Sequence, residues 1–223
     1  MSEGPNVWAV VVAAGSGERF GGRKQFELLG GRPIAAWSVA AARSVAEGVV
    51  LVVPPGEAVH PALDVEAVVE GGATRADSVR AGLAAVPSTA EVVVVHDAVR
   101  PLASPDLFRA VVEVVCEGAD AAVPGVMVAD TLKRVRNRAV VDTVPRDGIV
   151  AVQTPQAFRA KVLREAHSGK SQATDDAGLV ERMGVEVRVV PGDSRNLKVT
   201  TPEDLRVAEA LTAAASRGEK GRS

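Results

Sequence analysis

The stretch VWAVVVAAGSGERFGGRK, which occupies residues 7–24, decides the fold. Its first part, from Val7 to Ala14, is continuously apolar and rich in valine, a pattern typical of a strand buried on both faces of a parallel sheet. Glycines and basic residues follow at once. Glycine lets backbone N–H groups approach an anion closely, and Arg and Lys supply positive charge. The stretch therefore predicts a buried strand followed by a loop that binds phosphate.

The loop matches neither of two common phosphate-binding templates. A dinucleotide fingerprint needs Gly or Ala at position 20, which is Phe20 here, and no acid marks the end of the next strand at Val53-Pro54-Pro55. A P-loop needs Gly-Lys-Ser/Thr, whereas Gly22 is followed by Arg23-Lys24-Gln25, so the magnesium-binding hydroxyl is missing. A dehydrogenase is therefore a distant alternative.

Apolar, β-branched runs recur along the chain, and segments with helix signals lie between them. We expect strands at Val7–Val12, Val49–Val53, Val65–Val69, Val92–Val95, Ala119–Val123, Ile149–Val152 and Val185–Val190. We expect helices at Pro33–Arg43, at Thr74–Val86, from Ser104 and from Thr201 to about Ala215. Strand and helix in alternation predict an α/β fold with a Rossmann-like, mostly parallel twisted sheet flanked by helices. The 223 residues fit one domain spanning 1–223.

One segment, about 126–146, breaks this alternation. It reads as two extended arms around Asn137-Arg138, with several basic residues near the tip. This pattern predicts a charged β-hairpin that projects from the domain. A projecting hairpin buries little of its own surface, so we expect it to pack on a partner. A solvated loop is the alternative.

Composition excludes several classes of function. The chain has 26 basic and 28 acidic residues, which argues against a general nucleic-acid binder, and its 2 Trp, 4 Phe and no Tyr are too few for base stacking. A single cysteine, Cys116, rules out an internal disulfide and a cysteine-built zinc site. The three histidines are scattered, and we expect His60 and His167 at the surface.

Targeting signals are missing from the sequence. The first apolar run is far shorter than the roughly 20 residues of a transmembrane helix, and Met1 to Asn6 lacks the basic residues of a signal peptide. We therefore expect a cytoplasmic protein. Cys116 is expected to stay reduced and to act as a small core residue.

Seven motifs in order resemble one enzyme family. They are Ala13-Ala14-Gly15-Ser16-Gly17-Glu18-Arg19 with Lys24-Gln25, Gly71 to Val79, His96 to Pro101, Asp130 to Lys133, Thr154-Pro155-Gln156, Thr174-Asp175-Asp176 and Asn196 to Thr200. Together they resemble the 2-C-methyl-D-erythritol 4-phosphate cytidylyltransferases of the non-mevalonate isoprenoid route, from about Trp8 to Ala210. The resemblance implies a fold of the nucleotide-diphospho-sugar transferase type. Arg23 and Pro145 depart from the family pattern, each beside a key residue.

The resemblance implies that CMP is transferred from CTP to 2-C-methyl-D-erythritol 4-phosphate, with release of pyrophosphate. Two anions must meet, so the site must neutralise charge. By resemblance, Arg19 and Lys24 stabilise the transition state at the α-phosphate, and Lys198 reaches the phosphates and positions the attacking group. Arg146 resembles the arginine that holds the polyol phosphate, a task that suits its two-donor fork.

The resemblance also assigns binding residues, a metal and a partner. It places CTP on Ala13, Ala14, Gly15, Gly72, Arg75 and Ser78, the polyol phosphate on Arg100, Thr131 and Thr154, and Mg²⁺ on Asp97 with Asp193 as a second candidate. Magnesium keeps phosphate oxygens and waters, so one carboxylate can suffice. The family is homodimeric through the hairpin arm, which would bring Thr131 and Arg146 to the partner's site.

Two other functions stay open at this stage. Ribitol 5-phosphate cytidylyltransferases share the scaffold and the CTP site, although Ala13-Ala14-Gly15 favours the methylerythritol type. A non-catalytic nucleotide-sensing module could keep the same pocket. Pyrophosphate release with each polyol phosphate distinguishes the three possibilities.

Overall fold

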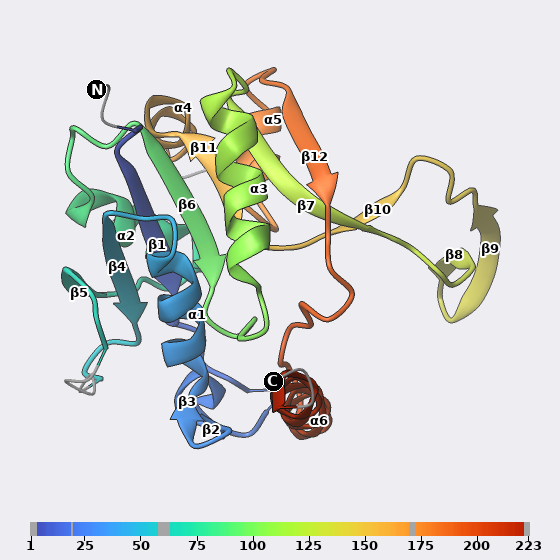
Figure 1. Cartoon of the computed structure of the whole chain (residues 1–223). Coiled ribbons are helices and arrows are strands. Elements are labelled where there is room, and N and C mark those ends of the chain that lie inside the picture. The colour runs from blue at the N-terminus through green and yellow to red at the C-terminus, as the bar shows by residue number, and fades with distance from the viewer. Residues whose placement is uncertain (1–3, 19, 58–62, 170–172, 221–223) are drawn as a thin grey trace.

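The computed structural model describes residues 4–18, 20–57, 63–169 and 173–220, and a central eight-stranded sheet organises them (Figure 1). The strand order is β10-β7-β11-β6-β1-β4-β5, and β12 pairs with β7. The strands are β1 (Val7–Val12), β4 (Gly48–Val53), β5 (Ala67–Glu70), β6 (Val92–Asp97), β7 (Ala121–Met127), β10 (Val150–Val152), β11 (Gln156–Arg159) and β12 (Val187–Pro191). The β6, β1, β4 and β5 strands run parallel, as does β12 on β7, whereas β10 and β11 are antiparallel to their neighbours. The predicted mostly parallel sheet is confirmed.

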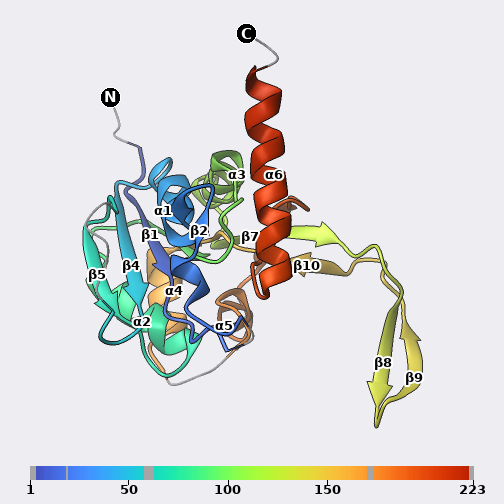
Figure 2. The same cartoon turned by 90° about the horizontal axis from the view of Figure 1, so that it is seen from below.

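Helices cover both faces of this sheet. They are α1 (Ile34–Arg43), α2 (Arg75–Ala85), α3 (Pro105–Cys116), α4 (Ala160–Ala166) and α5 (Ala177–Glu181), and a short 3₁₀ turn, η1, spans Lys24–Phe26. The last helix, α6 (Pro202–Lys220), packs instead in a separate apolar cluster with Leu29 and Ile34. One buried cluster joins α1 and α3 to the sheet, and a second joins α2, α4 and α5 to the opposite face. Figure 2 shows the two helix layers on either side of the strands. All six residues of β4 and of β6 are buried, which explains their uninterrupted apolar runs.

The polar backbone groups at the helix ends are capped by the side chains that the sequence predicts and, at α2, by one distant arginine. Thr74 and Asp77 form a capping box at α2, and the Ser104 hydroxyl accepts from the amide of Leu107 at α3. At the other end of α2, Arg164 donates to the carbonyls of Leu83 and Val86 at 2.9 Å each, and to that of Pro87 at 3.1 Å. Arg164 thus holds α4 against the end of α2, at the end of that helix away from the site described below.

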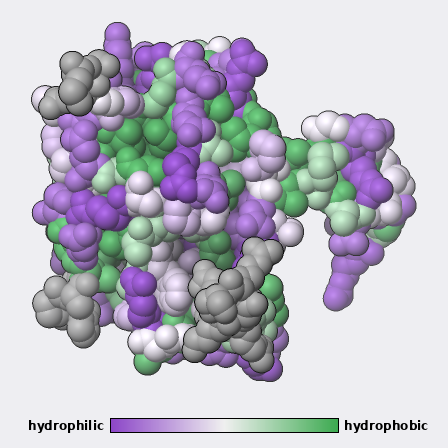
Figure 3. Space-filling view, in the orientation of Figure 1, coloured by the Kyte–Doolittle hydropathy of each residue, from purple (hydrophilic) through white to green (hydrophobic). Residues whose placement is uncertain are grey.

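The β8 (Leu132–Arg136) and β9 (Ala139–Val144) strands form a separate antiparallel pair. The turn between them is made by Asn137 and Arg138, whose φ values of 49° and 65° lie in the left-handed region. β7 and β10 extend as a stalk that carries this hairpin away from the main sheet (Figure 2). Figure 3 shows hydrophobic surface among the polar residues of the stalk and hairpin. The large apolar side chains exposed there are Met127, Val135, Val140, Val141 and Val152.

Some local details differ from the sequence predictions. A small antiparallel pair, β2 (Leu28–Leu29) with β3 (Arg32–Pro33), and the strand β11 were not anticipated. The last helix continues to Lys220. Among the described residues, no helix combines the length and apolarity that crossing a bilayer requires.

Two predicted side-chain environments were wrong. Cys116 is exposed, not a core residue, because it is the last residue of α3 and lies off the buried stripe formed by Phe108, Val111 and Val115. His167 is buried, not at the surface, because its ring lies at the end of α4 and bonds to Asp176 at the start of α5. His60 lies outside the described residues.

Candidate active site

A cavity of about 950 Å³ opens at the carboxyl ends of β1 and β6. Its wall combines the end of β1, the glycine-rich loop, Pro54-Pro55 after β4, the start of α2 and Lys198. β1 lies between β6 and β4. The connections that follow neighbouring strands therefore turn to opposite sides of the sheet, and a crevice forms between them at the carboxyl ends of the strands. The predicted residues Ala13, Ala14, Gly15, Lys24, Gly72, Arg75, Ser78, Asp97 and Lys198 all line this cavity.

The glycine-rich loop folds back on itself at Gly17. The Gly17 carbonyl accepts from the amides of Phe20 at 2.8 Å and Gly21 at 3.0 Å. Gly17 has a φ of +73°, and a Cβ atom there would overlap the carbonyl of Gly22, so only glycine fits. The buried amide of Gln25 donates to the Gly15 carbonyl at 3.2 Å and ties the two ends of the loop together. Lys24 is thereby held at the cavity wall. Arg19 lies outside the described residues.

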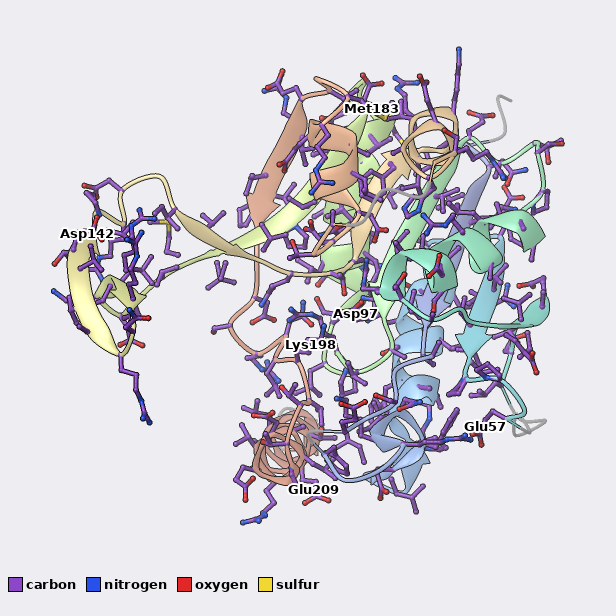
Figure 4. The ribbon with its side chains drawn as sticks, turned by 180° about the vertical axis from the view of Figure 1, so that it is seen from behind. Glu57, Asp97, Asp142, Met183, Lys198 and Glu209 are labelled. Carbon is purple, nitrogen blue, oxygen red and sulfur yellow. The ribbon has the colours of Figure 1, made fainter. Side chains whose placement is uncertain are left out.

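A chain of charged groups crosses the floor of the cavity. Asp97 accepts from Lys198 Nζ at 2.7 Å on one oxygen and from Arg75 Nε at 3.0 Å on the other. Arg75 continues to Asp176 at 2.7 Å, and the second oxygen of Asp176 lies 3.0 Å from His167 Nε2. Figure 4 shows Asp97 and Lys198 side by side, far from Asp142 on the hairpin. Segments more than a hundred residues apart in the chain are joined here.

Electrostatics keep Asp97 and Arg75, two inner members of this chain, ionised. Burial by itself would raise the pKa of Asp97, but the charges of Arg75 and Lys198 outweigh it and hold that pKa well below its usual range. Burial would lower the pKa of Arg75, but Asp176 and Asp97 raise it above its usual value. Removing one partner would leave a buried charge uncompensated, which is strongly destabilising.

A neutral hydrogen-bonded group supports Asp97 from below. The amide of Asp97 donates to the Thr154 hydroxyl at 3.0 Å, and that hydroxyl lies 3.2 Å from His96 Nδ1. The other ring nitrogen of His96 lies 3.3 Å from the Arg100 carbonyl. His96 is fully buried, and burial lowers its pKa to about 4 even though the Asp97 carboxylate acts in the opposite direction. The ring is therefore neutral at physiological pH and serves as a packing and hydrogen-bonding group.

The pKa of His96 predicts a pH dependence of stability. The unfolded chain binds a proton at this ring near pH 6.5, whereas the folded chain does so only near pH 4. Stability is therefore lost as pH falls through that window, by about 2 kcal/mol between pH 7.5 and pH 5. Urea unfolding of the wild type and of His96→Gln at both pH values measures this difference. An equal pH slope in the variant would show that another group is responsible.

The remaining predicted residues lie outside the cavity lining. Thr154 is 4% exposed and engaged beneath Asp97, and Arg100 donates to the Asn196 carbonyl at 2.8 Å. Thr131 and Arg146 are exposed near the base of the hairpin, where Arg146 donates to the carbonyls of Val128 and Ala129. The structure thus separates Thr131 and Arg146 from the cavity floor within one chain.

Asp97 is a carboxylate of the cavity floor that fits a magnesium ion. Among the described residues, no three His, Cys, Asp or Glu side chains converge as a ready-made metal site. Both oxygens of Asp97 already accept from cations, but a carboxylate has about four lone-pair positions, so it can take one metal bond more. Asp193 does not line the cavity, and its side chain accepts from the amide of Arg195 at 2.8 Å. The donors therefore fit an ion held mainly by phosphate oxygens.

Sequence reasoning missed three residues of this site. Asp176 is the N-cap residue of α5, and it is also 1% exposed and bonded to Arg75. Asn196 and Gln153 are buried beneath Lys198. Asp176 and Asn196 lie in two of the motifs that carry the family resemblance, but the residue types alone do not reveal their partners.

Comparisons with known proteins agree with the geometry. The model of a family described as 2-C-methyl-D-erythritol 4-phosphate cytidylyltransferase matches residues 7–214. Proteins of that name from Frankia casuarinae and Deinococcus radiodurans are 46% and 45% identical, over 98% and 93% of this chain and 86% and 90% of theirs. The crystal structure of the Thermus thermophilus protein of that name superposes with a TM-score of 0.81 at 38% identity, covering 92% of this chain and 98% of that one.

Proposed function

This chain belongs to the 2-C-methyl-D-erythritol 4-phosphate cytidylyltransferase family, and from that premise we propose that its reaction takes place in the cavity at the ends of β1 and β6. It is a nucleotidyltransferase that forms 4-diphosphocytidyl-2-C-methyl-D-erythritol and pyrophosphate from CTP and 2-C-methyl-D-erythritol 4-phosphate, in isoprenoid biosynthesis. The observation that carries the assignment of the site is the pairing of Lys198 and Arg75 on Asp97, facing the glycine-rich loop across one cavity.

In this proposal CTP occupies the cavity. The backbone at Ala13, Ala14 and Gly15, together with Gly72, Arg75 and Ser78, receives the cytidine, since these groups gather at the crevice between β1 and the start of α2. The triphosphate extends along the glycine-rich loop towards Lys24. A cavity of about 950 Å³ lies at the upper end of the size range for ligand pockets and suits a nucleotide.

The chemical step is an in-line attack by the polyol phosphate on the α-phosphorus of CTP. A phosphate monoester is already ionised near neutral pH, so no strong base is required. The task of the protein is to hold two anions together and to stabilise the charge that develops between them. Lys24 in the cavity wall and Lys198 at its floor supply that stabilisation. Asp97 fixes Lys198 before substrate arrives.

We also propose a divalent cation, with Mg²⁺ the expected one. Asp97 would hold it together with phosphate oxygens and water, whereas Asp193 lies away from the cavity. Such an ion supplies further neutralisation of the phosphate charge and orientation of the leaving pyrophosphate.

The hairpin supports a shared site in a homodimer. Arg146 and Thr131 lie at the base of an extension that leaves the body of its own chain, and exposed valines and Met127 line the same extension. Burying these side chains against a second copy would remove apolar surface from water. We propose that Arg146 and Thr131 of one protomer complete the polyol phosphate pocket of its partner. We place this enzyme in the cytoplasm, which holds the CTP pool.

Pyrophosphate release tests the substrate assignment. The enzyme is incubated with CTP and Mg²⁺ and either 2-C-methyl-D-erythritol 4-phosphate or ribitol 5-phosphate. We expect kcat/KM to be at least about 10²-fold higher for the methylerythritol compound, because a misplaced polyol hydroxyl leaves buried polar groups unpaired. Faster turnover of ribitol 5-phosphate would reverse the choice. CTP binding without pyrophosphate release from either compound would instead indicate a sensor.

A further inference from the structure

A buried amide pair lies beneath the loop that carries Lys198. We propose that Asn196 and Gln153, named here the amide clamp, are positioning residues that fix the backbone from which Lys198 reaches the reacting phosphates. This inference rests on the catalytic role proposed for Lys198. Asn196 is 0% exposed and Gln153 is 8% exposed, so neither reaches the substrate.

The two amides bond to each other and to the loop. Asn196 Nδ2 donates to Gln153 Oε1 at 3.2 Å and to the Thr154 carbonyl at 2.9 Å. Gln153 Nε2 donates to the Asp193 carbonyl at 2.8 Å and to that of Asn196 at 3.3 Å, and Gln153 Oε1 accepts from the Asp193 amide. The clamp therefore joins the loop at 193–196 to the chain at 153–154.

These bonds give hydrogen-bond partners to backbone groups of the loop. Residues 193–200 form neither helix nor strand, so their polar backbone groups have no regular partners. Gln153 of the clamp donates to the carbonyls of Asp193 and Asn196, and Arg100 adds a second donor at the Asn196 carbonyl. Apolar side chains of similar size would remove the clamp's bonds to both carbonyls.

The clamp lies close enough to Lys198 to control it. Asn196 precedes Lys198 by two residues, and Val199 directly after it donates its amide to the Val99 carbonyl at 2.8 Å. The loop is thus tied down on both sides of Lys198. The side chain of Lys198 is itself 41% exposed and has a flexible stem, so packing does not fix it. Its reach is set by where its backbone begins and by Asp97.

A double-mutant cycle tests the clamp. Asn196→Ala is expected to lower kcat by roughly 10- to 100-fold with a much smaller change in KM for CTP, because a displacement of about 1 Å at a catalytic group can cost that much. In a Lys198→Ala background the same substitution is expected to change kcat by less than about 3-fold, since the group that it positions is gone. Thermal unfolding of each variant monitors folding.

A second variant and a matched control complete the design. Gln153→Glu keeps the size of the side chain but places an oxygen against the Asp193 and Asn196 carbonyls. We expect it to lower kcat when Lys198 is present and to change kcat little in the Lys198→Ala background. This variant also decides the question if Asn196→Ala does not fold. Arg164→Ala is the stability control, because it removes the bonds to the end of α2 without touching the cavity. It should lower the unfolding temperature and leave kcat unchanged.

Two results would overturn the inference, and each identifies which proposal has failed. If the clamp substitutions lower kcat by the same factor with and without Lys198, they act through general structure and the clamp proposal fails alone. If Lys198→Ala leaves kcat unchanged, the catalytic role of Lys198 fails and the clamp proposal fails with it.

Discussion

Replacing Lys198 with alanine is expected to lower kcat by roughly 10²- to 10³-fold, a loss of about 3–4 kcal/mol of transition-state stabilisation. Lys198 places a positive charge at the cavity floor, 2.7 Å from Asp97. Without it, the two reacting anions repel each other with one cation fewer, and Asp97 presents a less compensated negative charge to them. Steady-state pyrophosphate release at saturating CTP and polyol phosphate measures the effect.

Lys161→Ala provides a matched control for that experiment. Lys161 is exposed on α4, on the face of the sheet covered by α2 and α5, and does not line the cavity. Its replacement removes the same charge from the protein at a distance from the phosphates, so kcat should stay within about 2-fold of wild type. A loss of less than 10-fold in Lys198→Ala would contradict the charge-neutralising role.

The charge balance of the cavity floor explains why several cations are needed there. Lys198 and Arg75 are balanced by Asp97 and Asp176, so this group of four has no net charge to offer an incoming anion. The glycine-rich loop adds Arg23 and Lys24, together with the acid Glu18, to the lining of the same cavity. We infer that Asp97 and Asp176 pre-align the cations of the floor, and that the basic residues of the loop bring further positive charge towards the triphosphate.

The main strands could be predicted because burial on both faces has a direct signature. β1 and β4 are almost entirely apolar, and apolar residues in continuous runs are what a covered parallel sheet requires. The prediction of individual side-chain burial failed where neighbouring residues of a helix face opposite directions. Cys116 follows buried Val115 directly, yet the helix turns it to the outside. The pattern of apolar residues cannot show whether the last residue of a helix is buried or exposed.

The polar interior could not be predicted for a different reason. Periodicity reports which face of an element is apolar, but it does not report which distant polar groups meet. Asp176 pairs with Arg75 across 101 residues, and Asn196 meets Gln153 across 43. Both acids of Asp175-Asp176 satisfy a local expectation for a helix start, so nothing in the local pattern singles out Asp176. Asp176 pairs with Arg75 only because the fold brings the start of α5 close to the start of α2.

The shared site predicts that two inactive variants restore each other. We expect Arg146→Ala to raise the KM for the polyol phosphate strongly, by removing a two-donor phosphate contact. At low substrate, Arg146→Ala and Lys198→Ala should each be nearly inactive alone. If Arg146 serves the partner's cavity, a hybrid dimer of the two variants contains one site with both residues intact and one site with neither.

Random mixing makes this outcome quantitative. About half of the dimers are hybrids and each has one intact site of two, so activity should return to about a quarter of wild type after co-refolding or subunit exchange. The Michaelis constant of the restored activity should equal that of the wild type, since the intact sites are unaltered. A double variant, Arg146→Ala with Lys198→Ala, mixed with either single variant is the control, because no combination then yields an intact site. If the mixture of single variants stays inactive while subunit exchange is demonstrated by a tagged copy, Arg146 acts in its own chain, and the hairpin must fold back towards the cavity of the same protomer.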